Sequence, residues 1–163
     1  MEGFAPKRKA ARNMGAEDQL EHDERYNHAD EYLEVVYKLL EGSWEDDAVV
    51  RDKETGVFTD PAKVHDINHE GKYFKVPGIH ISEPSPQRTP VLFQAGSSGR
   101  GQQFAAANAE ATFIFAPNPA HAAKVAAGVR ARAVDAGRLP GDVKVFTGLS
   151  FVVGGTEAEA QRK

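Results

Sequence analysis

The clearest hydrophobic pattern in the chain is a stripe of helical spacing near the N-terminus. Apolar and aromatic residues recur at intervals of three and four: Ala29, Tyr32, Leu33, Val36, Tyr37 and Leu40. This spacing places them on one face of an α-helix. Gly42 follows the last of them, and glycine is typical of the position just after a helix ends. The pattern therefore predicts an amphipathic helix that follows a charged segment (residues 17–30) and is closed by Gly42.

Two stretches have no sustained period. Residues 1–16 contain scattered glycine and proline and are expected to be a ragged lead-in. Residues 43–89 are rich in acidic residues, glycine and proline, which interrupt any long pattern. Short β-like pieces remain at 73–76 and 79–81, and they predict a small hairpin. We interpret the second stretch as an inserted excursion, because a connection of this length is uncommon within a compact domain.

A regular alternation of apolar runs and helical patterns begins at residue 90. Strands are expected at 90–95, 111–116 and 143–153, and helices at 100–109, 119–136 and from Thr156 onward. The strands are almost continuously apolar, which is typical of a parallel sheet covered on both faces. The order β-α-β-α-β-α predicts an α/β fold with about three parallel strands and flanking helices. Three strands and a short last helix look like part of a larger architecture.

The segment Gln94–Gly101 contains the most informative candidate site. Small residues, including Gly96, Ser97 and Ser98, lie where a predicted strand ends and a helix begins. Backbone N–H groups at a helix N-terminus favour an anion, and serine hydroxyls donate to phosphate oxygens. The glycine order matches neither the dinucleotide fingerprint nor the P-loop. The alternative interpretation is a plain βα turn in which Ser98 is the helix N-cap.

Two pairs of residues show helical i, i+4 spacing that could carry chemistry. His22 and Tyr26 share a helix face if the long helix extends back that far, and together they suit a phosphate or a ribityl hydroxyl. The alternative is a solvated helix end without a ligand. His65 and His69 have the spacing of two metal ligands, but they lie in the excursion, where ordinary loop roles are favoured. We therefore predict no metal site.

Composition narrows the function classes. The chain has 163 residues, a formal net charge of -4 and no cysteine. The mild acidity argues against a general nucleic-acid binder, and no apolar run reaches the roughly 18 residues of a membrane span. The absence of cysteine excludes disulfides, thiol nucleophiles and zinc-thiolate sites. No apolar run follows the basic N-terminal residues, so a secretory signal is not expected, and we predict a cytoplasmic protein.

Several segments together resemble one known family. They are residues 21–26, 29–39, 42–44, 61–65 and 84–98, within a resemblance that covers about 10–163. The combination is similar to the nitrilotriacetate monooxygenase and dibenzothiophene-sulfone monooxygenase group. That group belongs to the bacterial-luciferase-like flavin monooxygenases.

The resemblance implies a fold, a cofactor and partners. It implies a (β/α)₈ TIM barrel, FMN reduced by a separate flavin reductase, and oxygenation of a small organic substrate by O₂. The cofactor carries the oxygen chemistry, while the protein orients it. The family's grip on the FMN phosphate falls on His22 and Tyr26, and on the loop with Gly96, Ser97 and Ser98. The variable excursion at 43–83 is expected to be a lid over the barrel mouth.

The length sets a second expectation. A whole barrel needs about 250 residues, and the resemblance begins part-way through one, so we expect an incomplete barrel. Three strands cannot close a barrel, and apolar faces and sheet edges would remain exposed. The alternative function is therefore a catalytically inactive barrel remnant or an assembly module. Such a module would pair with a complementary chain or form a homo-oligomer.

Overall fold

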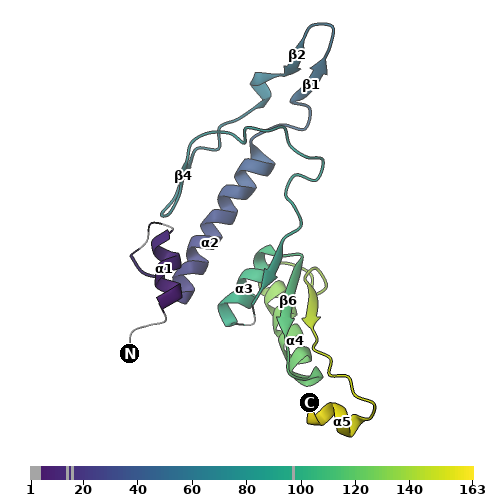
Figure 1. Ribbon diagram of the computed structural model, residues 1–163. Coiled ribbons are helices and arrows are strands. Elements are labelled where there is room, and N and C mark those ends of the chain that lie inside the picture. The colour runs from purple at the N-terminus through teal and green to yellow at the C-terminus, as the bar shows by residue number, and fades with distance from the viewer. Residues whose placement is uncertain (1–4, 14, 16, 97) are drawn as a thin grey trace. The chain divides into compact units, whose positions relative to one another are not determined.

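The computed structural model describes residues 5–13, 15, 17–96 and 98–163 (Figure 1). The chain divides into two compact units, Met1–Pro90 and Val91–Lys163. The first contains the long helix and the excursion, and the second contains the parallel sheet. The α/β prediction is confirmed in the second unit.

Two α-helices begin the first unit. Helix α1 spans Ala5–Asn13, and α2 spans His22–Tyr37 and continues as one π-helical turn over Lys38–Gly42. The predicted long helix and its end at Gly42 are confirmed. The ragged lead-in was wrong over α1, where alanine, lysine and arginine are good helix formers. The predicted stripe is only half-buried, and Tyr32 is exposed.

Two small antiparallel hairpins form the excursion. Strands β1 (Val49–Asp52) and β2 (Val57–Thr59) make the first hairpin, and β3 (His69–Glu70) and β4 (Lys75–Val76) make the second. A 3₁₀ turn, Pro61–Lys63, lies between them. The sequence predicted one small hairpin, whereas the structure has two, and the predicted β-like piece at 79–81 belongs to neither. The register instead places His69 opposite Val76.

Residues 79–81 form no strand because their backbone groups bond to side chains. The N–H of His80 donates to the Ser43 hydroxyl at 3.0 Å, and its carbonyl accepts from the Trp44 indole at 2.7 Å. Ser43 is fully buried and Trp44 nearly so. Side-chain partners of this kind compete with a strand ladder for backbone groups. The Arg88 guanidinium also donates to the Trp44 carbonyl at 2.8 Å, so this contact holds both ends of the excursion together.

The second unit is a three-stranded parallel sheet with helices between its strands. Strands β5 (Phe93–Ala95), β6 (Ala111–Phe115) and β7 (Lys144–Gly148) lie in the order β5-β6-β7. Helices α3 (Gly99–Asn108), α4 (Pro119–Asp135) and α5 (Glu157–Arg162) follow the three strands in turn. The predicted alternation is confirmed. The third strand is shorter than predicted, since residues 149–153 join no ladder.

The two faces of this sheet differ. One face packs on α3 and α4 through a buried cluster: Ala106, Ile114, Val125, Val129, Ala133 and Val143. The opposite face carries large exposed side chains: Phe93, Phe113, Phe115 and Phe146. Phe113 and Phe146 are paired in register on the central and outer strands, which places them on the same face. Aromatic rings on this face contact each other, Phe93 with Phe146 at 5.9 Å and Phe113 with Phe115 at 5.5 Å.

Candidate functional site

The loop after β5 leads directly into the first turn of α3. Ser98 has an extended backbone and is the N-cap, since its hydroxyl accepts from the Gly101 N–H at 3.0 Å. The predicted strand–turn–helix placement and the N-cap role are both confirmed. The turn therefore combines a hydroxyl with the positive end of a ten-residue helix.

His22 and Tyr26 lie one turn apart at the start of α2. Their ring centroids are 5.2 Å apart in an edge-on arrangement. The His22 Nδ1 is 2.6 Å from the Asp23 carboxylate, and about half of the His22 side chain is exposed. A protonated imidazole donates from both ring nitrogens, and a phenol donates from its hydroxyl. The two side chains share one helix face, as the spacing predicted, and their use for a phosphate stays a prediction.

The structure brings the predicted residues together as two separate groups. His22 and Tyr26 contact each other in the first unit, whereas Gly96 and Ser98 are neighbours on one turn of the second. Ser97 lies outside the described residues. The resemblance alone connects the two groups, and their joint role stays a prediction.

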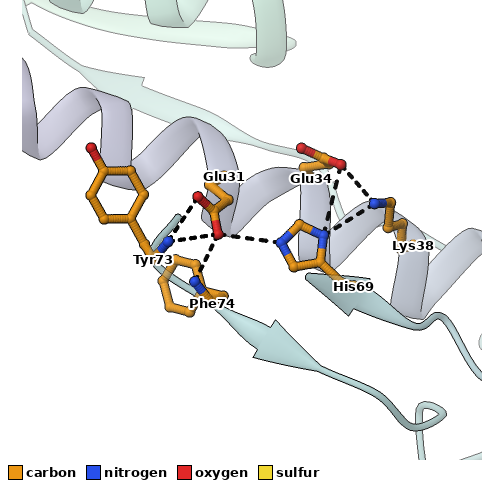
Figure 2. Close-up of polar contacts among 6 residues, drawn as sticks. All are labelled: Glu31, Glu34, Lys38, His69, Tyr73 and Phe74. Carbon is orange, nitrogen blue, oxygen red and sulfur yellow. Dashed lines mark hydrogen bonds and ion pairs between the residues drawn. The ribbon is translucent and has the colours of Figure 1, made fainter. Parts of the chain in front are cut away.

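Sequence reasoning missed a polar cluster between α2 and the β3–β4 hairpin (Figure 2). The Glu31 carboxylate accepts from the backbone N–H of Phe74 at 2.7 Å and of Tyr73 at 3.0 Å. His69, which is 3% exposed, places Nε2 at 3.3 Å from the same carboxylate and Nδ1 at 3.1 Å from Lys38 Nζ. An ammonium only donates, so Nδ1 accepts and the proton lies on Nε2. The imidazole therefore bridges a carboxylate and an ammonium.

Glycine is required at position 71 of this cluster. A Cβ there would lie 2.0 Å from Glu31 Oε1 and 2.7 Å from His69 Nε2. The pKa of Glu31 is lowered: burial raises it, but the N–H groups of Phe74 and Tyr73 and the His69 contact outweigh burial. A glycine two residues after a histidine was the available signal, but nothing in the local sequence connected it to Glu31.

A second carboxylate on α2 binds the tip of the same hairpin. Glu24 accepts from Lys72 Nζ at 2.8 Å, from the Tyr73 hydroxyl at 2.5 Å and from Asn27 at 3.0 Å. The Lys72 bond, followed by those of Tyr73 and Asn27, lowers the pKa of Glu24 to about 2. The bond to Glu24 in turn raises the pKa of Lys72. These groups are charged at neutral pH and hold the hairpin tip on α2.

The two histidines of the excursion do not share a metal site. His65 Nε2 lies 2.8 Å from Glu45, whereas His69 is bound to Glu31 and Lys38. Their segment is not helical, so the i, i+4 spacing does not place them on one face. Across residues 5–13, 15, 17–96 and 98–163, no three potential ligands are grouped around a metal position. In the same residues, no helix has both the length and the apolar character needed to span a membrane.

Comparison with known proteins agrees with the sequence resemblance. A family model described as "Luciferase-like monooxygenase" matches residues 4–163. Dimethyl-sulfide monooxygenase from Hyphomicrobium sulfonivorans is 58% identical, over 94% of this chain and 32% of the relative. Nitrilotriacetate monooxygenase component A from Aminobacter aminovorans is 40% identical, over 94% of this chain and 34% of the relative. The chain thus spans about a third of the length of the curated relatives it matches.

Solved structures give the same result. Long-chain alkane monooxygenase superimposes with a TM-score of 0.84 at 54% identity, over 94% of this chain and 35% of that one. A riboflavin lyase solved with modified FMN and riboflavin superimposes with a TM-score of 0.85 at 44% identity. The match covers 96% of this chain and 34% of that one. These neighbours are luciferase-like TIM-barrel enzymes. The predicted barrel architecture is therefore the one to which this three-stranded sheet corresponds.

Replacing Gly71 by alanine is expected to destabilise the helix–hairpin unit. The new methyl group would overlap the Glu31 carboxylate and force the hairpin turn away from α2. Overpacking of this kind costs about 1–3 kcal/mol of unfolding free energy, measured by chemical denaturation. Gly78→Ala is the matched control, because no atom lies within 4 Å of its Cβ position. Equal stabilities of the two variants would contradict the close approach.

The contact between Glu24 and the hairpin is expected to weaken in acid. The pKa of Glu24 is lowered from 4.5 to about 2, so its contribution to stability is present above pH 4.5 and is lost as pH falls towards 2. The stability difference between wild type and Glu24→Gln should therefore shrink over this range, followed by denaturation at successive pH values. Glu54→Gln, at an exposed turn of the β1–β2 hairpin, is the control. A difference that stays constant down to pH 2 would exclude this coupling.

Proposed function

The chain belongs to the luciferase-like monooxygenase family, and we propose that it is part of an FMN-dependent monooxygenase of a small organic substrate. The observation that carries this proposal is the match of the family model over residues 4–163, together with relatives named as monooxygenases that match 94% of the chain. Luciferase-like monooxygenases use reduced FMN, and when bound that cofactor supplies the oxygen chemistry. The chain spans about a third of those relatives, so the activity belongs to the whole barrel.

The part of the site in this chain is a grip for the FMN phosphate. His22 and Tyr26 offer an imidazole and a phenol one helical turn apart. Gly96 and Ser98 lie between β5 and α3, Ser97 is assigned to the grip by the resemblance alone, and the helix end capped by Ser98 favours an anion. In α/β barrels, phosphate groups bind at the carboxyl ends of strands and at helix N-termini. The donors present fit a phosphate dianion and leave the flavin ring to other parts of the barrel.

The proposal includes a second protein that reduces the flavin. One relative is named component A of nitrilotriacetate monooxygenase, which is a name for one part of a multicomponent system. A separate flavin reductase is the partner that this arrangement requires. We also propose that residues 43–83 are a lid over the barrel mouth. Within this segment, the β3–β4 hairpin is bound to α2 through Glu24 and Glu31. The cytoplasm is the proposed location.

Comparison of FMN with riboflavin tests the phosphate grip, because riboflavin lacks the phosphate. We expect the chain to bind FMN more tightly than riboflavin, and His22→Ala and Ser97→Ala each to weaken FMN binding about tenfold. Riboflavin affinity should not change, and flavin fluorescence titration measures both constants. Ser150→Ala, in an exposed loop after β7, is the control. Unchanged FMN affinity in both site variants would refute the assignment.

A non-catalytic assembly module is the second candidate function. The exposed sheet face carries Phe93, Phe113, Phe115 and Phe146, with Phe115 76% exposed. The edges of β5 and β7 are unpaired in the described sheet. Apolar surface of this kind marks a surface that another polypeptide covers. The proposed occupant is a second copy of this chain, whose own sheet face exposes the same aromatic side chains.

Sedimentation analysis distinguishes the two candidates. If this face drives assembly, the chain is expected to associate at micromolar concentration, and Phe115→Glu combined with Phe146→Glu should produce monomers. Val134→Glu, on the exposed side of α4, is the control. A monomeric wild-type chain would remove the assembly function and leave the phosphate grip unaffected.

A further inference from the structure

The hairpin β3–β4 covers the side of α2 opposite the proposed phosphate residues. An α-helix turns about 100° per residue, so Glu24 lies half a turn from both His22 and Tyr26. Glu24 binds the hairpin tip, and the ring of His28, one turn further on, lies 4.9 Å from that of Tyr73. The hairpin therefore contacts α2 without covering the face that carries the two phosphate candidates.

The first turn of α2 contains two acidic residues, Asp23 and Glu24, but no side-chain cap. Within the described residues, the N-cap Glu21 makes no capping hydrogen bond through its side chain. A helix N-terminus without such a cap is prone to fray. The carboxylate of Glu24, in this same turn, is held by Lys72 and Tyr73 across the hairpin and by Asn27 within the helix. The bonds from Lys72 and Tyr73 to Glu24 thus stabilise a helix turn that has no side-chain cap.

Further along α2, the contact continues and fixes the position of the hairpin. Glu31 accepts the N–H groups of Tyr73 and Phe74 (Figure 2). The Phe74 ring also lies 4.6 Å from that of His28. The hairpin tip is therefore held along two turns of the helix. Because the hairpin tip is itself held by Glu31, its bonds to Glu24 can restrain the first turn of α2.

We propose that Glu24 is a positioning residue for the FMN phosphate. Bound to Lys72 and Tyr73, it holds the first turn of α2 in place, so that His22 and Tyr26 keep the geometry that a phosphate needs. The β3–β4 hairpin is then a brace for the cofactor site. This inference rests on the proposed FMN function and adds the residues that support it from the opposite face of the helix.

The test measures how strongly the 163-residue chain prefers FMN over riboflavin. The double variant Lys72→Met, Tyr73→Phe removes two of the partners of Glu24 and leaves the Glu31 contacts to the backbone. We expect its FMN dissociation constant to rise about fivefold while that of riboflavin stays constant. A general loss of structure would weaken both ligands alike. Glu83→Gln, which breaks the exposed ion pair with Arg51, is the control and should change neither constant.

A conservative variant and hydrogen exchange of backbone amides test whether the first turn of α2 depends on the hairpin. Lys72→Arg keeps a cation beside Glu24 and should retain the wild-type preference, while hydrogen exchange at residues 22–28 should accelerate only in the double variant. If wild type prefers FMN and the double variant does so equally, the brace is refuted and the phosphate grip stands. If wild type does not distinguish FMN from riboflavin, the phosphate grip is refuted, and the brace with it.

Discussion

The carboxylate of Glu31 joins α2 to a hairpin turn that lies 42 and 43 residues further along the chain. Strands of two residues each cannot hold a hairpin together in water. Glu31 provides acceptors for two turn N–H groups and for the buried His69, and those bonds need Gly71 to bring the turn close. The carboxylate stays charged because these donors outweigh its burial. Without this anion, the hairpin loses the acceptor for its turn N–H groups and keeps the bonds of Lys72 and Tyr73 to Glu24.

The two sides of α2 make different kinds of contact. The hydrophobic pattern of the sequence describes only the apolar side. The apolar stripe and the pair His22–Tyr26 share one side, while the carboxylates of Glu24 and Glu31 share the other. The only buried residue of α2 is Val35, which lies on the carboxylate side, three turns from Glu24. A hydrophobic stripe is therefore a poor guide to what this helix buries within its own unit. The side of α2 that packs on the hairpin is instead determined by the polar contacts of Glu24 and Glu31.

Features set by neighbours in sequence could be predicted, and features set by distant partners could not. Three N-cap side chains, Asn118, Ser98 and Thr156, each bond an N–H three residues on, and the alternation of strands and helices follows from short apolar runs. The contacts of Glu31 with the β3–β4 hairpin join residues about forty positions apart, so no local pattern contains them. The third strand was overextended because residues 149–153 are apolar yet remain exposed and unpaired.

The two halves of the proposed phosphate grip consequently depend on contacts of different range. The turn at Ser98 is maintained by a bond to Gly101 within the same helix end, so it forms with α3 itself. The turn at His22 has no side-chain cap from Glu21, and it contains Glu24, which is bound by Asn27 within the helix and by Tyr73, 49 residues away. Changes in the excursion therefore act on the helical half and leave the loop half intact. In this way, the excursion can adjust cofactor affinity in the proposed grip without altering the strand–turn–helix at Ser98.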